Sequence, residues 1–546
     1  MRIPHLPALA CLLLALSPLA PTQAAPKAPV DAARLRAADA EPGQWLMDGR
    51  NYSAQRYSEL AAINEGNVKQ LGLAWFAELD TYRGVEATPL FVDGVIYNTS
   101  AWNITSAYNA KTGRRLWTYD PKVPREWGRY ACCEPVARGL AFWKGKVIIA
   151  TLDGRLIALD ARKGKPVWSA QTFTHDWPYS ITGAPRVFDG MVVVGNGGAD
   201  LGVRGFVSAW DADTGKFLWK FYLVPGDPAK GPDGAASDSV MPMAAKTWNG
   251  EWWKWGGGGT AWDSINYDPE LGLIYVGTGN GGPDAQLYRS PQRGDNLFLC
   301  SIVALDAKTG AYRTHFKIVG KDWHDWDVSS APALVTTASG RRMMLVAPKD
   351  GHLYGFDLDT KERLYRVPVT KIENADVPFA ADKSVHFCPG SVGGAEWNGP
   401  AYDPQNNLVL VGEVQWCTTV RITFTQHRIN GTPFHLVVAS LDVLFLVVLW
   451  VLRIVRQLVA LALQFLDRRH QLRNRGADVR QLDDVGFRRL GHLAQFSQRI
   501  VLLLRRGQIF RKHGDNAARE RDVAQLHRHA RRLGERVDDR QERIGS

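Results

Sequence analysis

The feature that most constrains the fold is a motif that recurs along the chain at a nearly fixed step. Each copy is a short β-type apolar run, then an Asp or Asn, then a turn that usually reads Ala-x-Thr-Gly, and then an aromatic residue. The copies are marked by Asn109, Asp160, Asp211, Asp306 and Asp357, with steps of 51, 51, 95 and 51 residues. The turn residues are typical of hairpins, in which Gly supplies a positive φ. Periods of this length indicate a propeller or a solenoid.

The aromatic position favours the propeller. Trp117, Trp168 and Trp219 follow the turn at the same offset in three successive copies, which predicts one packing slot between neighbouring units. A solenoid would use the same local chemistry, but radial closure protects the edges of the sheets. We therefore predict an all-β propeller with tryptophan docking motifs over residues 40–422.

Two adjacent cysteines, Cys132 and Cys133, form a second unusual feature. Consecutive Cα atoms lie about 3.8 Å apart across a trans peptide, whereas relaxed disulfides prefer roughly 4.4–6.8 Å. A disulfide between neighbours is therefore strained, and strain of this kind tends to occur at functional sites. Two unrelated thiols are the alternative that the doublet alone leaves open.

The N-terminus resembles a secretory signal over residues 1–24, with a basic start, an apolar run and a small-residue exit. The apolar run is short for a membrane span. The signal predicts a periplasmic protein, in a compartment where disulfides persist. Removing the signal leaves five cysteines, and Cys300 is the expected free thiol because a strand-like run follows it. Within this sequence no Cys-x-x-Cys-His motif occurs, so no covalent c-type haem is encoded.

The net charge of +11 belongs to the C-terminal part of the chain. Residues 423–546 hold 22 Arg, one Lys and 12 acidic residues, whereas residues 1–422 hold 43 basic and 43 acidic ones. The Gly-rich turns also stop near residue 422, in the middle of a repeat. Our preferred hypothesis is that residues 423–546 are an anomalous Arg/Leu-rich tail, unrelated to the body and translated out of frame.

Two alternatives remain open for this tail. The apolar stretch 434–466 is long enough for a membrane anchor, and positive charge follows it. A basic nucleic-acid-binding tail is the third interpretation, which an exported protein disfavours, so we expect no nucleic-acid partner.

The body from about Trp45 to Arg421 resembles the pyrroloquinoline quinone (PQQ) dependent alcohol dehydrogenases, which are eight-bladed propellers. The segments that carry the resemblance are specific in combination: Gly84–Pro89, Arg129–Gly139, Thr182–Arg186, Gly195–Asp200, Gly256–Asp263, Gly277–Gly281 and His324–Asp327. At a step of 51 residues, the body accommodates about six of eight repeats. We expect an incomplete ring with open sheet edges, which invite aggregation, and therefore a chain that folds poorly or is inactive.

The resemblance implies a PQQ site on the propeller axis, between the Cys132–Cys133 disulfide and the plane of Trp262. Because PQQ is a flat tricarboxylate, its burial requires cations and hydrogen-bond donors. The implied polar and lining residues are Glu86, Arg138, Thr182, Ala199, Thr260 and Lys349. Solvated loop charges are the alternative for the charged residues, and blade packing is the alternative for Trp262.

The same resemblance implies a metal ion bound by Asp200, Asn280 and Asp325. Asp200 departs from the family pattern, because many alcohol dehydrogenases have Glu there. Asp327 resembles the extra carboxylate of lanthanide-dependent members, so Ca²⁺ and a lanthanide both remain open. Asp325 is the candidate catalytic base that takes the proton of the substrate hydroxyl. His324 is more often a structural hydrogen bonder in such a position.

Two further details follow from the resemblance. Glu396 precedes Trp397 where many family members have Asn, which leaves the substrate preference open. Cys388 and Cys417 are expected to form a second, structural disulfide.

Together these features predict a periplasmic quinoprotein dehydrogenase that oxidises a small alcohol or related hydroxyl compound. It would pass electrons to a separate acceptor such as a cytochrome c. The alternative is a non-enzymatic propeller scaffold in envelope assembly, which would share the repeats but has no need of the cysteine doublet, Arg138, Asn280 and Asp325 together.

Overall fold

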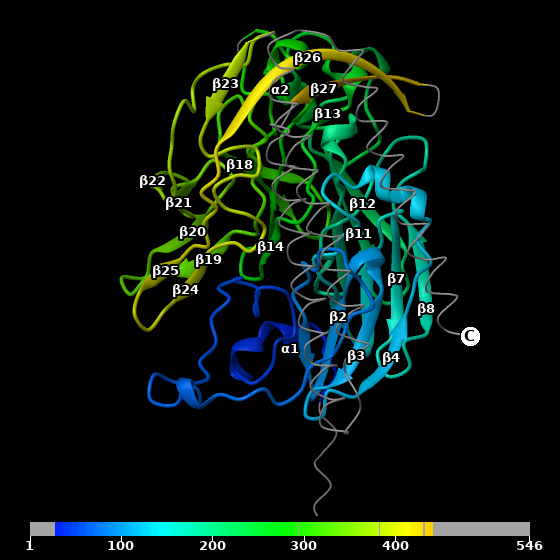
Figure 1. Cartoon of the computed structure of the whole chain (residues 1–546), viewed down its shortest axis with the longest axis vertical. Helices are drawn as coiled ribbons and strands as arrows, with labels where there is room; N and C mark the ends of the chain where they lie inside the picture. The colour runs from blue at the N-terminus through cyan, green and yellow to red at the C-terminus, as the bar shows by residue number, and fades with distance from the viewer. Residues whose placement is uncertain (1–27, 293, 382, 430–431, 440–546) are drawn as a thin grey trace, which may run out of the picture. The chain divides into compact units, whose positions relative to one another are not determined.

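The computed structural model describes residues 28–292, 294–381, 383–429 and 432–439 (Figure 1). The predicted signal (1–24) and residues 440–546 of the predicted tail lie outside these ranges, so the interpretation of both stays a prediction. Among the described residues, no helix has the length and apolar character to cross a membrane. Most of the apolar stretch 434–466 also lies outside the described part.

The described chain is built mainly from antiparallel sheets, and five of these have four strands. The first contains β1 (Leu90–Val92), β2 (Val95–Thr99), β3 (Thr105–Asn109) and β4 (Arg115–Tyr119). The second contains β5 (Ala141–Trp143), β6 (Lys146–Ala150), β7 (Arg155–Asp160) and β8 (Pro166–Gln171). The third contains β9 (Arg186–Phe188), β10 (Met191–Gly195), β11 (Phe206–Asp211) and β12 (Phe217–Tyr222).

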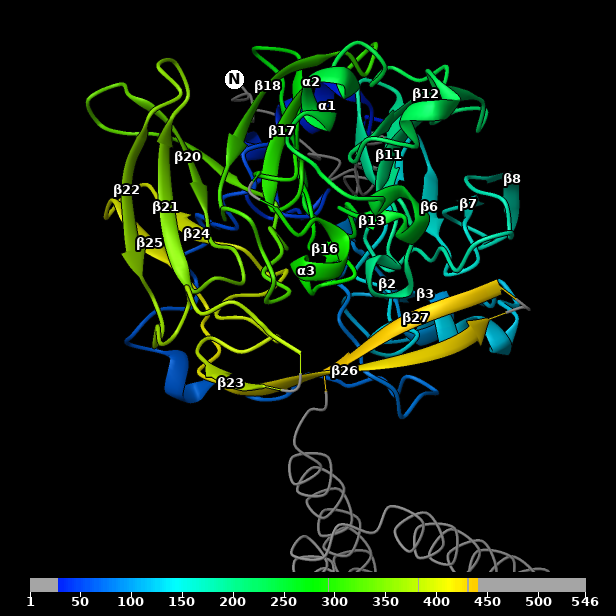
Figure 2. The ribbon, with the colours of Figure 1, turned by 90° about the horizontal axis from the view of Figure 1, so that it is seen from above.

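The fourth contains β14 (Ile265–Asp268), β15 (Leu273–Gly277), β17 (Ser301–Asp306) and β18 (Tyr312–Lys317). The fifth contains β19 (Ala333–Thr336), β20 (Arg342–Val346), β21 (His352–Asp357) and β22 (Arg363–Pro368). Successive sheets lie beside one another in chain order (Figure 2), and β9 contacts both β5 and β14. The all-β propeller class is confirmed by these sheets together with the comparisons reported below.

Smaller elements complete the described part. Two short sheets pair β13 (Gly257–Gly258) with β16 (Gly281–Gly282), and β24 (Ala401–Asp403) with β25 (Leu408–Leu410). A three-stranded sheet contains β23 (Ser384–Phe387), β26 (Thr418–Ile429) and β27 (Thr432–Ala439), so β26 runs across residue 422. The α-helices are α1 (Ala32–Arg36), α2 (Met241–Ala245) and α3 (Gln286–Arg289). The 3-10 turns are η1 (Ala38–Ala40), η2 (Val68–Gln70), η3 (Ala101–Asn103), η4 (Arg125–Tyr130), η5 (Ala199–Leu201), η6 (Pro228–Lys230) and η7 (Trp252–Trp255).

The recurring Asp or Asn ends the third strand of each four-stranded sheet. In the third sheet, the Asp211 carboxylate accepts hydrogen bonds from the backbone N–H groups of Asp213 (3.1 Å) and Thr214 (2.7 Å). The same pair of bonds recurs at each of the other four copies. This Asx turn closes the hairpin to the fourth strand, which explains why the motif repeats so strictly.

The tryptophans dock between neighbouring sheets, as the sequence predicts. Trp117 packs on Gly164, where an added Cβ would lie 2.6 Å from the ring, and Trp168 packs on Gly215 in the same way. Trp219 packs on Gly310. Trp75, which lies outside any described strand, makes the same contact with Gly113. Since no side chain fits beneath the ring, glycine is required at these turns.

Burial differs between the strands of one sheet. Every residue of β10 is buried, because its two faces pack on neighbouring sheets, whereas β8 is largely exposed. The burial of such strands explains why the corresponding sequence segments, Lys146–Thr151 and Met191–Gly195, are apolar runs. The wide step of 95 residues has a structural cause: η6, α2, η7 and β13 are inserted between β12 and β14, and β16 and α3 are inserted between β15 and β17. The first insertion carries Trp262 and the second carries Asn280.

Candidate cofactor and metal site

The Gly-rich segment that carries Trp262 is wedged against its neighbours. A Cβ on Gly183 would meet the carbonyl oxygen of Trp262 at 2.0 Å, and a Cβ on Gly195 would meet that of Ala261 at 2.1 Å. Asp263 accepts a hydrogen bond from the backbone N–H of Ala184 (3.0 Å). These close backbone approaches fix the position of the Trp262 ring, which is only partly buried.

Arg138 connects several of the predicted cofactor residues. Its guanidinium donates to Thr182 Oγ1 (2.7 Å), pairs with Glu86 (2.8 Å) and lies 4.5 Å from the centre of the Trp262 ring. The side chain is buried, and among the described residues its Nε has no hydrogen-bond partner. Burial raises the pKa of Glu86 despite the attraction of Arg138. A buried cation with a spare donor beside an aromatic plane fits an anionic planar ligand.

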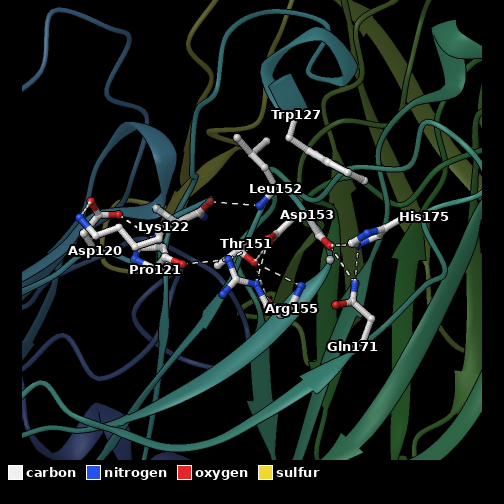
Figure 3. Close-up of polar contacts among 12 residues, drawn as sticks. Asp120, Pro121, Lys122, Trp127, Thr151, Leu152, Asp153, Arg155, Gln171 and His175 are labelled. Carbon is white, nitrogen blue, oxygen red and sulfur yellow. Dashed lines mark hydrogen bonds and ion pairs between the residues drawn. The ribbon is translucent and has the colours of Figure 1, made fainter. Parts of the chain in front are cut away.

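The Cys132–Cys133 disulfide forms, with 3.8 Å between the Cα atoms, and both residues are exposed. Figure 3 shows the polar cluster that holds the segment leading to it. Arg155 donates to the carbonyl oxygen of Pro121 (2.9 Å) and pairs with Asp153 (2.8 Å). The ring of Trp127 lies 4.4 Å from that of His175. The sequence gives no signal for this support, because its members come from separate turns.

Lys349 joins the cofactor residues to the predicted metal residues. Its ammonium lies 2.8 Å from Asp327 and 3.2 Å from Asp325, and 5.8 Å from the centre of the Trp262 ring. Burial lowers the pKa of Lys349, but Asp325 and Asp327 outweigh it and hold the pKa well above its usual value. Burial raises the pKa of Asp325 well above its usual value, against the attraction of Lys349. Asp325 also has a φ of 71°, a left-handed conformation that non-glycine residues rarely adopt.

A cluster of oxygen donors surrounds Asn280. The carboxylates of Asp200, Asp284 and Asp325 offer oxygens that all lie within 4.8 Å of one another. Asn280 Nδ2 donates to Asp284 (2.6 Å) and Asp200 (3.3 Å), and the Asn280 backbone N–H donates to Asp327 (2.5 Å). Burial raises the pKa of Asp284 to about 7, and Asp200 adds to the shift. Sequence reasoning missed Asp284, which only the folded chain brings to this cluster.

Three remaining candidates have distinct positions. Thr260 is buried, and its carbonyl oxygen accepts from Gly279 N (2.9 Å). Ala199 is buried at the start of η5, directly before Asp200. His324 stacks on Trp326 with 3.9 Å between the rings, and its Nδ1 lies 3.6 Å from Asp322. These contacts fit the structural role expected for His324.

Glu396 completes the polar side of the site. Burial raises the pKa of Glu396 to about 7, although Lys349 and Arg138 act in the opposite direction. The guanidinium of Arg138 also lies 4.9 Å from the ring of the adjacent Trp397. The Glu396–Trp397 pair therefore faces the same cations as the predicted cofactor site.

The remaining cysteines of the described part form one further disulfide and one free thiol. A second disulfide joins Cys388 and Cys417, with 4.4 Å between the Cα atoms. Within the described residues Cys300 is a free, buried thiol. The disulfide agrees with the pairing implied by the resemblance, and the free Cys300 agrees with the expectation from the strand-like run that follows it.

The donor set fits a hard cation, because carboxylate and amide oxygens are the ligands that such ions prefer. Four-stranded sheets with a cationic, tryptophan-backed site beside these oxygens define a β-propeller protein whose site fits an anionic cofactor and a metal ion.

Comparison with known proteins agrees with this class. The family model described as PQQ glucose/ethanol/alcohol dehydrogenase, β-propeller domain, matches residues 45–382, and the chain belongs to this family. It is 45% identical over 412 residues to quinohemoprotein alcohol dehydrogenase ADH IIB of Pseudomonas putida, covering 72% of this chain and 59% of that protein. It is 46% identical over 399 residues to the dehydrogenase subunit of alcohol dehydrogenase (quinone) of Gluconobacter oxydans, covering 68% and 52%.

Solved structures give the same result. The quinohemoprotein alcohol dehydrogenase ADHIIG of Pseudomonas putida HK5 matches with a TM-score of 0.68 and 44% identity, over 72% of this chain and 60% of that one. A europium-containing methanol dehydrogenase matches with a TM-score of 0.66 and 33% identity, over 74% of each chain. The chain spans just over half the length of the curated relatives it matches. The resemblance is thus confirmed at the level of the family.

Proposed function

We propose that this chain carries the site of a periplasmic quinoprotein dehydrogenase, which binds PQQ and a metal ion and whose reaction is the oxidation of an alcohol or a related hydroxyl compound. The incomplete ring expected from the sequence would reduce or abolish turnover in this chain. The observation that carries the proposal is the arrangement of Arg138 and Lys349, two buried cations that both face the Trp262 ring. Lys349 is at the same time paired with Asp325 and Asp327, next to the oxygen-donor cluster. A non-enzymatic scaffold gains nothing from such a costly arrangement of buried charges.

PQQ, when bound, supplies a quinone that accepts two electrons from the substrate. Arg138 and Thr182 would hold its carboxylates, with Glu86 and Thr260 on the remaining polar edge. Trp262 and the Cys132–Cys133 disulfide would cover its two faces and exclude water. Lys349 would stabilise negative charge near the quinone oxygens.

Asp325 would act as the base and take the hydroxyl proton of the substrate. A base must be ionised, and a cation bound by Asp200, Asn280 and Asp325 would lower the pKa that burial raises. Both Ca²⁺ and a lanthanide fit the oxygen donors. The electrons would then pass to a separate acceptor such as a cytochrome c. One relative, 1-butanol dehydrogenase (cytochrome c) of Thauera butanivorans, carries such an acceptor in its name.

The test measures PQQ binding before turnover, because the incomplete ring expected from the sequence could abolish turnover even if the cofactor binds. PQQ binding by the full chain is followed by quenching of tryptophan fluorescence, with Ca²⁺ or La³⁺ present. Dye-linked oxidation of short alcohols is then measured for the full chain and for Asp325→Ala. We expect PQQ binding in both proteins and no turnover in the variant. Failure to bind PQQ with either ion would refute the proposed cofactor, and measurable turnover that is equal in the two proteins would refute the role of Asp325.

A further inference from the structure

We propose that Asp284 is a ligand of the metal ion, in addition to Asp200, Asn280 and Asp325. The proposal rests on the proposed function, which supplies the metal, and it concerns a residue that the resemblance does not assign. Asp284 follows β16, so its position depends on the pairing of Gly281–Gly282 with β13.

The distances suit ligands of a single ion. Calcium-type ions hold their oxygen ligands at about 2.3–2.6 Å, so two ligands of one ion are at most about 5 Å apart. Oxygens of Asp200, Asp284 and Asp325 lie within 4.8 Å of one another. All three can therefore contact one ion without a large movement of the backbone.

Asn280 ties Asp284 to the expected ligands. Its side-chain amide lies 2.6 Å from Asp284 and 3.3 Å from Asp200. The nitrogen and oxygen of an amide are assigned from such contacts, and a half-turn of the group directs its oxygen to a cation between these carboxylates. The donor atoms of neighbouring ligands on one ion are separated by distances of this size.

Charge balance supplies a separate reason. Lys349 pairs with Asp325 and Asp327, and among the described residues no Lys, Arg or His forms an ion pair with Asp200 or Asp284. Two such carboxylates side by side repel each other unless a cation lies between them. A bound ion removes this repulsion, and a trivalent ion attracts the pair more strongly than a divalent one.

The backbone at Asp284 is held firmly in place. The buried Arg289 donates to the carbonyl oxygens of Pro283 (2.5 Å) and Asp284 (3.0 Å), and also to that of Asp322 (2.6 Å). A Cβ on Gly281 would meet the Arg289 guanidinium at 2.2 Å, so the loop closes over this side chain. The carboxylate of Asp284 therefore extends from a loop of fixed position. It supplies a ligand oxygen at a site where Asp200 has a shorter side chain than the Glu of many family members.

The experiment titrates the full chain, in the presence of PQQ, with Tb³⁺ and separately with Ca²⁺. Tb³⁺ luminescence sensitised by tryptophan reports the first and calorimetry the second, so neither depends on turnover. The variants are Asp284→Asn, Asp200→Asn and, as a matched control, Asp295→Asn at an exposed position of the same insertion. Asn at position 284 keeps a hydrogen-bond acceptor for Asn280 but loses the charge.

We expect Asp284→Asn to weaken Tb³⁺ binding at least tenfold and Ca²⁺ binding less, and Asp295→Asn to stay within twofold of the parent. Without metal, Asp284→Asn should unfold at the same urea concentration as the parent or at a higher one, because repulsion with Asp200 is relieved. Such a result would show that the variant is folded. Tb³⁺ affinity within twofold of the parent, while Asp200→Asn weakens it tenfold, would overturn the role of Asp284 and leave the proposed function standing. A parent chain that binds neither ion would refute both.

Discussion

Two tryptophans in equivalent packing positions allow the contribution of one hydrogen bond to stability to be measured. Trp117 and Trp168 each lie over a glycine of the next sheet and are buried to a similar degree. Trp117 Nε1 donates to the carbonyl oxygen of Ala161 (2.9 Å). The Trp168 Nε1 is buried and has no hydrogen-bond partner among the described residues. Replacement by Phe removes the same atoms at both positions, so the packing losses largely cancel.

The magnitude follows from the two nitrogen atoms. Trp117→Phe loses a hydrogen bond worth about 1 kcal/mol, whereas Trp168→Phe removes an unpaired buried donor that costs about 1–3 kcal/mol. We expect the free energy of unfolding to fall further for Trp117→Phe, by about 2–4 kcal/mol relative to Trp168→Phe. Urea unfolding of the full chain followed by far-UV circular dichroism measures the difference, because tryptophan fluorescence itself changes in these variants. Equal losses, or a larger loss for Trp168→Phe, would refute the reasoning.

Two further predictions concern the site. Gly183→Ala forces the carbonyl of Trp262 away, because the new Cβ would lie 2.0 Å from its oxygen. PQQ affinity measured by fluorescence quenching should therefore fall at least tenfold. The control Gly43→Ala, whose new Cβ meets no neighbour, should leave the PQQ affinity unchanged. Burial raises the pKa of Glu396 to about 7, above the usual value near 4.3, so its contribution to stability is present below about pH 4 and is lost as the pH rises through 7. Glu396→Gln should therefore gain stability over the parent chain between pH 5 and 7.5 in urea unfolding without cofactor, and parallel pH profiles of the two proteins would contradict this.

The sequence predicted the fold because its signals are local and repeated. The Asx turn at Asp211 and its equivalents involves residues only two or three positions apart, so the pattern can be read from one copy and checked against the others. The docking of Trp117 on Gly164 follows from the same step. The family resemblance then assigned residues such as Arg138 and Lys349, which the structure brings to the same tryptophan ring.

By itself, the sequence determined the repeat, the hairpin chemistry, the tryptophan slot and the doublet Cys132–Cys133. Only the tertiary structure placed Asp284 beside Asp200 and Asp325, residues that are separated by 84 and 41 positions in the chain. It also showed that the Trp168 nitrogen has no partner among the described residues while that of Trp117 has one. The physical reason is the range of the interactions: turn formation depends on neighbouring residues, whereas charge clusters arise where loops from different sheets converge.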